Sequence, residues 1–442
     1  MKAYRASLLW FAPHHEGPPQ ALYEEDGLLL VGPNAAGLQV VQAIGSWREL
    51  YAQCAQVPVE HLPGRIIAPG FVDLHVHFPQ TNIIGSPASG LLPWLENYTF
   101  PEEKRFASMD YAAEAAGFFV DELLRNGVTT TLAFASSHST SVNALFAEAQ
   151  KRSLRLITGL CLMDRNAPAD LLNQPGSQVD ATLQSLLDSE ALIQQWHGKG
   201  RLGYAITPRF APTSTDAQLR GAGELAERYP DVWIQSHVAE NLHEIAWARE
   251  LFPASRSYLS TYDDFGLMRE RAVYAHCIHF DDADRALMRE SGASAAISPT
   301  SNLFLGSGFF DYEGADRIGF GYGLASDVGG GTSFSPFHTM LAAYNVGREG
   351  QTKAGLSLSP QHLWWQHTAG AGRVLGVKGT DGQPLVGNLL PGCEADFVVL
   401  KPKATPLLAR KTALASNLDE LLFSMIVLGD DRLIERTVIS QA

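Results

Sequence analysis

Two histidines, His75 and His77, stand one residue apart in the apolar run FVDLHVH. Side chains two residues apart in a β-strand leave the same face, so both imidazoles would point to one side of a strand. Two imidazoles on one face can bind a metal ion together. A chain of 442 residues with 14 histidines would contain this spacing about 0.4 times by chance, so the pair alone is weak evidence for a metal site.

Three further residues of ligand type stand in later apolar runs. His237 ends VWIQSH, His276 lies in VYAHC and Asp327 ends YGLASD. Three imidazoles and one carboxylate form a donor set that Zn²⁺ or Fe²⁺ accepts, and a catalytic site also leaves a position open for water. We expect the metal ligands to be His75, His77, His237 and Asp327. His276 is either a further ligand or, as we favour, a neighbour of the bound water or the substrate.

Glu240 follows His237 by three residues, in SHVAENLHE. A carboxyl group that leaves a strand beside a metal can take a proton from bound water and deliver it to a leaving group. Alternatively, an acidic residue in a first helical turn simply interacts favourably with the helix dipole. Glu244, one turn further on, fits that simpler role better. Glu240 is therefore the candidate proton shuttle.

Some (β/α)8 barrel enzymes hold two metal ions with the help of a carboxylated lysine at the end of the fourth strand. In this sequence the corresponding run ends in AITPRFAPT, which contains no lysine. The sequence therefore favours one metal ion per chain. Arg209 can offer a fork of donors to ring heteroatoms, and Phe210 can offer a stacking face. Without the nearby metal candidates, packing at the rim of a barrel would explain this pair as well.

Eight apolar runs alternate with helical segments from residue 66 onwards, and these elements would position the candidates. Such runs, bounded by turn residues, are typical of parallel strands covered on both faces. They predict an α/β fold with a (β/α)8 TIM-like barrel over residues 67–375, whose active site lies at the C-terminal ends of the strands. Residues 300–320 interrupt the alternation, and we expect a long loop there. The runs are FVDLHVH, VTTTLAF, LRLITGLCL, LGYAIT, VWIQSHV, VYAHCI, SAAIS and YGLAS.

Both ends of the chain have a different pattern. Residues 1–66 contain the short β-type runs RASLLWF, GLLLVG and LQVVQAIG, and the tail contains GNLLPGCEADFVVL and LIERTVIS. Turn residues separate these runs, with no long helical pattern between the N-terminal ones. We expect residues 1–66 and 376–442 to form one discontinuous β-sandwich domain.

Composition excludes several classes of partner. The chain has 33 basic and 47 acidic side chains, a net charge of −14, which disfavours nucleic-acid polymers and anionic membranes. No apolar stretch approaches the ~20 residues of a membrane span, and the N-terminal apolar run is too short for a signal peptide. The four cysteines form no CxxC pair. We expect a cytoplasmic protein.

Five segments carry a family resemblance: APGFVDLHVHFPQT, TPRFAPTS, QSHVAEN, SPTSNLFLGSG and ASDVGGGTSFS. They resemble the amidohydrolase superfamily, and within it the enzymes that deaminate guanine. The likeness covers nearly the whole chain. It implies one Zn²⁺ per chain, with Fe²⁺ as the open alternative, held by the four ligands named above. It also implies that Glu240 is the proton shuttle. As a mechanistic hypothesis we add catalytic roles for Asp327, which would accept a proton from water, and for His276, which would stabilise the developing charge.

The same resemblance implies the substrate and its contacts. Guanine would be hydrolysed to xanthine and ammonia in purine catabolism, by an enzyme that is commonly a homodimer. Gln80 and Arg209 would hydrogen-bond the polar ring edges, since a glutamine amide offers a donor and an acceptor together. Phe210 and Trp94 would stack on the ring, and His237 would also touch the substrate. The cytidine-deaminase design is excluded because the chain has no PCxxC.

Two alternatives stay open. A related amidohydrolase can use the same metal residues to deaminate another amino-heterocycle, such as a pterin or 8-oxoguanine, because pocket residues set that choice. A barrel can also persist as a metal-free scaffold or binding protein. The second alternative predicts damaged ligand positions, whereas every expected ligand is present in this sequence.

Overall fold

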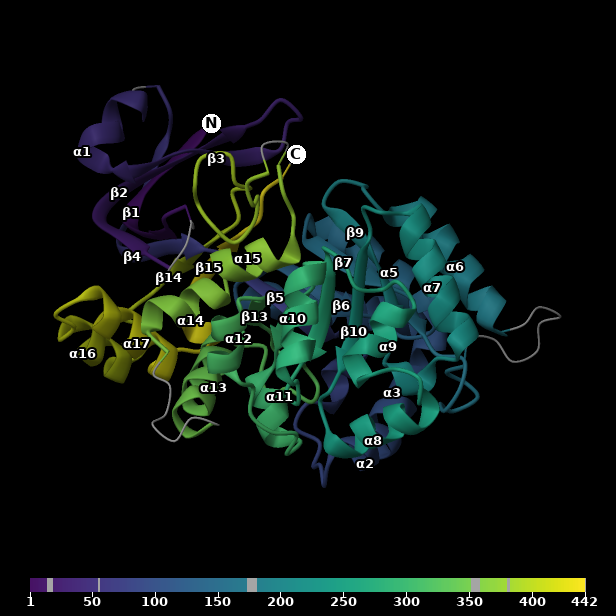
Figure 1. Ribbon diagram of the computed structural model, residues 1–442. Coiled ribbons are helices and arrows are strands. Elements are labelled where there is room, and N and C mark those ends of the chain that lie inside the picture. The colour runs from purple at the N-terminus through teal and green to yellow at the C-terminus, as the bar shows by residue number, and fades with distance from the viewer. Residues whose placement is uncertain (14–18, 55, 173–180, 351–357, 380–381, 442) are drawn as a thin grey trace.

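The computed structural model describes residues 1–442 except 14–18, 55, 173–180, 351–357, 380–381 and 442. Its centre is a parallel barrel in the order β13-β12-β11-β10-β9-β7-β6-β5, with β8 beside β9 and helices around the strands (Figure 1). The eight predicted runs are confirmed as strands, and the third run, LRLITGLCL, is divided into two of them, β7 and β8. Their bounds are β5 (Phe71–His77), β6 (Val128–Phe134), β7 (Arg155–Gly159), β8 (Cys161–Leu162), β9 (Leu202–Pro208), β10 (Trp233–Val238), β11 (Ala272–His276), β12 (Ser294–Ile297) and β13 (Gly321–Leu324).

Backbone hydrogen bonds bring the first and last barrel strands together just beyond β13. The amide of Asp327 donates to the carbonyl of His75 and the amide of His77 donates to the carbonyl of Val328, both at 2.8 Å. Every residue of β5, β6, β9 and β11 is buried, which explains why these strands are nearly continuous apolar runs. The nearly closed barrel therefore places the ends of β5 and β13 side by side.

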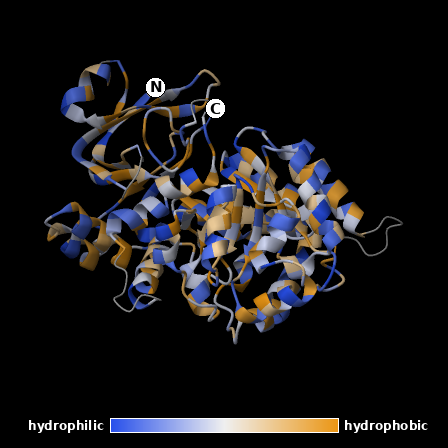
Figure 2. Ribbon diagram, in the orientation of Figure 1, coloured by the Kyte–Doolittle hydropathy of each residue, from blue (hydrophilic) through white to orange (hydrophobic). Residues whose placement is uncertain are grey.

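Hydrophilic and hydrophobic residues alternate on the helices that face the viewer in Figure 2, as expected of amphipathic helices packed on a barrel. In α4 the buried residues include Ala112, Ala116, Phe119 and Leu123, at the three- and four-residue spacing of one helical face. The helices are α4 (Met109–Arg125), α5 (Ser139–Arg152), α6 (Ala181–Trp196), α7 (Asp216–Arg228), α8 (Leu242–Leu251), α9 (Tyr258–Asp264), α10 (Asp282–Ser291), α13 (Pro336–Glu349), α14 (Pro360–Gln366) and α15 (Ala369–Leu375). In the described part of the chain, none of the helices is long and apolar enough to cross a membrane.

The expectation of a long loop over residues 300–320 is wrong. Two short helices lie there, α11 (Pro299–Phe304) and α12 (Tyr312–Ile318). Proline occupies the first turn of α11, where its missing N–H costs nothing, and Asp311 caps α12 by accepting from the amide of Gly314. Each helix is too short to give a readable hydrophobic period.

The connection from β5 to α4 consists of short helical segments. It carries two sequence candidates, Gln80 and Trp94, over the C-terminal end of the barrel. Proline and glycine interrupt this stretch, so no regular period predicts its course. The segments are η2 (Phe78–Ile83), α2 (Leu91–Trp94), η3 (Leu95–Thr99), α3 (Phe100–Glu103) and η4 (Lys104–Ala107), and η5 (Ala211–Thr213) follows β9.

Both chain ends form one six-stranded sheet in the order β15-β14-β4-β1-β2-β3 (Figure 1). The sheet curls back on itself, because the amide of Val41 donates to the carbonyl of Cys393 and that of Ala395 to Gln39. One apolar cluster joins side chains from β1, β2, β3, β4 and β14 inside this curl. The bounds are β1 (Lys2–Phe11), β2 (Ala21–Pro33), β3 (Gln39–Ser46), β4 (Val59–Pro69), β14 (Phe397–Leu400) and β15 (Ile434–Val438), with α1 (Trp47–Leu50) and η1 (Tyr51–Cys54) between β3 and β4.

The tail also contains two helices that the sequence did not predict, α16 (Pro406–Ala413) and α17 (Leu418–Leu428), and η6 (Asp431–Leu433). Helix α17 packs against α13 and α14, so the tail contacts the barrel as well as the sheet. Only Gly70 separates β4 of the sheet from β5 of the barrel. The domain boundaries at residues 66 and 376 stay a prediction.

A buried ion cluster connects the terminal sheet to the barrel. Arg201, just before β9, donates to Glu394 at 2.6 Å and also pairs with Asp396. Arg155, at the start of β7, donates through its Nε to the same glutamate at 2.9 Å. The second oxygen of Asp396 accepts from the amide of Ser440 at 2.7 Å. Cations from the barrel therefore neutralise anions at the start of β14.

Candidate active site

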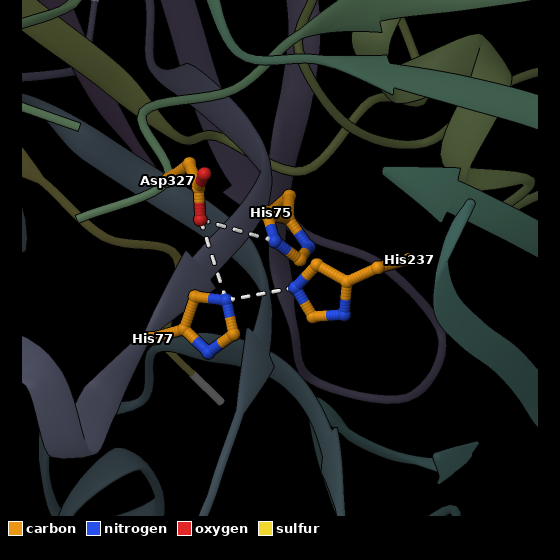
Figure 3. Close-up of side chains that lie close together, drawn as sticks. All are labelled: His75, His77, His237 and Asp327. Carbon is orange, nitrogen blue, oxygen red and sulfur yellow. Dashed lines mark hydrogen bonds and ion pairs between the residues drawn. The ribbon is translucent and has the colours of Figure 1, made fainter. Parts of the chain in front are cut away.

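The four predicted metal ligands meet at the C-terminal end of the barrel (Figure 3). The Oδ1 atom of Asp327 lies 3.2 Å from Nε2 of His75 and 3.3 Å from Nε2 of His77. The Nε2 atoms of His77 and His237 are 3.1 Å apart. All four ligand atoms lie within 4.8 Å of one another, and three separate strand ends supply them.

The donor set fits a divalent cation. The Nδ1 atom of His237 lies 2.6 Å from the carbonyl oxygen of Arg209, so Nδ1 donates there and Nε2 keeps its lone pair for the cluster. The Nε2 atom of His75 is buried and faces Asp327 at 3.2 Å without the geometry of a hydrogen bond. Burial lowers the pKa of His77 to about 4 and also lowers the pKa values of His75 and His237. Three neutral imidazoles and a carboxylate thus converge without competing protons.

Asp73 orients two of these ligand segments, and sequence reasoning missed it. Its carboxylate is buried and accepts from the amide of His75 at 3.2 Å and from the amide of Ser326 at 3.0 Å. These amides belong to the chain segments that carry His75 and Asp327. Asp327 itself has a φ of +50°, a left-handed conformation that non-glycine residues seldom adopt. The surrounding hydrogen bonds hold this strained turn in place.

His276 lies beside the four-residue cluster. Its Nδ1 atom is 2.9 Å from Oδ1 of Asn302, on α11. Its Nε2 atom is 3.4 Å from Glu240 and 3.8 Å from Asp327, so it faces two carboxylates. His276 therefore lies next to both acidic side chains of the site, and its place beside the bound water or the substrate stays a prediction.

Glu240 is buried over the cluster. Its Oε1 atom accepts a hydrogen bond from Ser307 at 3.0 Å, and its other oxygen faces His276. Burial raises the pKa of Glu240 to about 8, and the nearby charge of Asp327 adds to the rise. A carboxyl group with this pKa is protonated for much of the time near neutral pH, as a proton donor requires. Ser307 was not predicted, because it reaches the site from the segment between α11 and α12.

Glu244 caps helix α8, as the sequence suggested, but it is also buried in the pocket wall. One of its oxygens accepts from the amides of Glu240 and Asn241 at 3.1 and 3.2 Å. The other accepts from the hydroxyl of Tyr258 at 2.7 Å. Glu244 therefore fixes the backbone from which the Glu240 side chain extends.

One pocket is lined by three of the metal candidates, His77, His237 and Asp327, and by all the predicted substrate contacts. Gln80, Trp94, Arg209 and Phe210 line it, together with three leucines that make its apolar wall. The indole Nε1 of Trp94 is buried without a hydrogen-bond partner among the described residues. The pocket lining consists of His77, Gln80, Leu91, Trp94, Leu95, Arg209, Phe210, His237, Glu240, Glu244, His276, Leu305, Asp327 and Gly330.

Arg209 is not the free donor fork that the sequence suggested. Both terminal nitrogens donate to the buried carboxylate of Glu103, at 2.6 and 3.0 Å. Gln80 donates to the same carboxylate at 3.2 Å. Glu103 lies on the irregular connection between β5 and α4, and no motif or period in the sequence marked it.

Comparisons with known proteins agree with this geometry. The model of the amidohydrolase family matches residues 66–440. Guanine deaminase of Escherichia coli is 40% identical in sequence, over 99% of this chain and 96% of its own. A solved structure of E. coli guanine deaminase superposes with a TM-score of 0.92 and covers 99% of this chain and 98% of that one. A guanine deaminase from C. acetobutylicum, solved with guanine in its active site, is 28% identical with a TM-score of 0.87 over 99% and 98%. The chain, with its barrel and its strand-end cluster, therefore belongs to the amidohydrolase family.

Proposed function

We propose that the protein is a metal-dependent guanine deaminase, which hydrolyses guanine to xanthine and ammonia. The observation that carries this proposal is a single pocket lined by His77, His237 and Asp327 of the four-residue cluster, by a proton donor and by a ring-binding group. Relatives of nearly the same length are named guanine deaminases, and one was solved with guanine bound.

The four clustered residues would hold one metal ion per chain. Their imidazole and carboxylate donors suit Zn²⁺, and Fe²⁺ is the alternative. When bound, the ion acts as a Lewis acid that lowers the pKa of a water toward about 7. The family and the cluster support a metal, and the choice of zinc is part of this proposal.

The carboxyl groups over the cluster would move the protons. Asp327 accepts the proton of the attacking water as it adds to carbon-2 of guanine. Glu240, whose pKa burial raises to about 8, first protonates the adjacent ring nitrogen. It then takes up the proton of the new hydroxyl group on carbon-2 and passes it to the amine, which leaves as ammonia while the carbon–nitrogen bond breaks and the carbonyl forms. The proton held by Asp327 returns to Glu240 and restores both groups. His276 faces both carboxylates through Nε2 and stabilises the charge that develops between them.

The opposite side of the pocket would hold the ring. Gln80 and Arg209 hydrogen-bond its polar edges, and Phe210 and Trp94 offer flat faces for stacking. His237 lines the pocket beside Phe210 and touches the substrate near the reacting carbon. A planar, polar-edged heterocycle is the ligand that this combination of surfaces fits.

The test is ammonia release by the purified protein. Guanine should be deaminated faster than a pterin or 8-oxoguanine, and a preference for either of those would assign the pocket to another heterocycle. Glu240→Gln keeps the shape of the side chain but removes the titrating group, so kcat should fall about 10²- to 10⁴-fold with unchanged metal content. Full activity in this variant would overturn the proton-shuttle role.

We further propose that the enzyme works in the cytoplasm, as a homodimer, in purine catabolism. The family resemblance suggests the dimer and the pathway. Cys54, Cys161 and Cys277 are buried thiols outside any disulfide, as is usual in a reducing compartment. Light scattering coupled to gel filtration tests the dimer, and a monomer mass would reject it.

A further inference from the structure

We propose that Glu103 sets the charge selectivity of the pocket, by holding Gln80 and Arg209 as one uncharged hydrogen-bonding unit that accepts neutral rings and disfavours anionic ones. This inference rests on the proposed function, since it concerns the same substrate. It concerns a residue that lies outside the pocket lining and touches the ring-binding side chains from behind.

The first support is geometric. Glu103 has only 1% of its surface exposed and accepts from both terminal nitrogens of Arg209 in a two-pronged pairing. Such paired hydrogen bonds fix the plane of a guanidinium. Because Gln80 donates its Nε2 to the same carboxylate, the plane and orientation of its amide are fixed too. The Oε1 atom of Gln80 faces the amide of Gly329 at 3.3 Å, which confirms that orientation.

The second support is the charge balance. Arg209 is 3% exposed, and Phe100 covers its guanidinium at 5.4 Å from the ring centroid. A buried cation without a partner would attract anions strongly, because little water screens it. The Glu103 carboxylate cancels this charge, so that Arg209 presents hydrogen-bond donors without a net positive field. The other ionisable groups of the pocket lining lie at its metal end: Glu240, Glu244, Asp327 and the three histidines His77, His237 and His276.

The consequence is a preference among purine rings according to their charge. Guanine is uncharged near neutral pH, whereas more highly oxidised purines lose a proton. At the ring-binding end of the pocket, an anionic ring would gain attraction only if Arg209 lacked its counter-ion. Discrimination by unfavourable charge is a common way to obtain specificity. Glu103 is therefore a positioning residue, which acts on the substrate through Gln80 and Arg209.

The experiment compares two purines that lack an exocyclic amine and cannot be deaminated. Hypoxanthine is the uncharged probe and urate is the anionic probe, and calorimetry on metal-loaded protein gives the ratio of their dissociation constants. In Glu103→Gln the affinity for urate should rise about tenfold relative to the affinity for hypoxanthine, because Arg209 is no longer neutralised. In the same variant the KM for guanine should rise more than kcat falls.

Glu102 supplies a matched control. It is the preceding residue of α3, it is also buried, and it bonds to Asn82, Arg105 and Tyr111 rather than to the ring-binding group. Glu102→Gln removes the same charge but should leave the urate-to-hypoxanthine ratio within about twofold of the wild-type value. An unchanged ratio in Glu103→Gln, or an equal shift in Glu102→Gln, would overturn the proposal.

Loss of a buried ion-pair partner can prevent folding, so a second variant is needed. Glu103→Asp keeps the negative charge but withdraws it by one methylene. Both probes should then bind more weakly by similar factors, with the wild-type ratio retained, and a shift toward urate would contradict the charge argument. The two proposals fail separately: a wild-type protein that does not deaminate guanine rejects the proposed function, whereas the binding ratios need no turnover.

Discussion

Both ring nitrogens of His276 have polar neighbours, and together they fix the orientation of the imidazole. The side-chain amide oxygen of Asn302 can only accept, so Nδ1 donates to it at 2.9 Å. This contact turns Nε2 toward Glu240 and Asp327. The ring is therefore held against the two carboxyl groups, close to the reacting atoms. Asn302 sets this arrangement from α11, outside any catalytic pattern in the sequence.

Ser307 offers a residue-scale prediction about Glu240. Its hydroxyl donates to the buried carboxyl group at 3.0 Å and fixes its rotamer. Ser307→Ala should lower kcat about tenfold with little change in KM, because a hydrogen bond to a charged group contributes roughly 1.5–3 kcal/mol, and only part of it is lost in the transition state. Steady-state kinetics with guanine measure this split. A raised KM at normal kcat would instead place Ser307 in substrate binding.

The same scale shows what sequence reasoning can reach within the site. The ligand candidates were found because they end apolar runs, and strand ends meet at one edge of a barrel. Glu103, Ser307 and Asn302 come from irregular connections, where neither period nor motif predicts a position. Only the folded chain brings these three residues into contact with the site residues that they orient.

Among the elements, the barrel strands were predicted closely, whereas the short helices were not. Strands buried on both faces leave long apolar runs, so their bounds agree with the sequence to within a few residues. Helices α11 and α12 have six and seven residues, about two turns each, which gives too few repeats for a helical pattern. The tail helices α16 and α17 have only eight and eleven residues and lie between two β-type runs, so they too give few repeats of a helical period.

His367, between α14 and α15, gives a prediction about how these helices dock on the barrel. The Nδ1 atom of His367 donates to the carbonyl of Val72 at 3.0 Å, and the backbone carbonyl of His367 accepts from the amide of Val72. Burial lowers the pKa of His367 to about 4. The unfolded chain binds this proton below about pH 6.5, whereas the folded protein resists it until about pH 4. Its contribution to stability is therefore complete above pH 6.5 and is lost as the pH falls toward 4.

His367→Gln should remove that part of the pH dependence. Glutamine can still donate to Val72 but does not titrate. Between pH 6.5 and pH 4, the free energy of unfolding of the variant should therefore fall by about 3 kcal/mol less than that of the wild type. Denaturant unfolding at several pH values measures the difference, and the comparison cancels other groups that titrate in the same range. Parallel stability curves for the two proteins would show that His367 is protonated without unfolding.

For the molecule as a whole, metal removal should lower thermal stability. The cluster draws residues from β5, from β10 and from the segment after β13, so a bound ion would link distant parts of the barrel. An ion that binds only the folded state stabilises it by about 4 kcal/mol at a thousand times its dissociation constant. Calorimetry should show a lower Tm after chelation, restored by Zn²⁺ or Fe²⁺ according to the native metal. An unchanged Tm would indicate that the cluster does not bind an ion tightly.

The seam at which the barrel nearly closes also fixes when the site can be completed during synthesis. His75 and His77 leave the ribosome early, whereas Asp327, whose amide bonds back to His75, follows about 250 residues later. A nascent chain therefore exposes a histidine pair long before the carboxylate that completes the set is translated. Full coordination has to wait until the eighth strand has been made and docked against the first, which makes metal loading one of the last steps in the maturation of this protein.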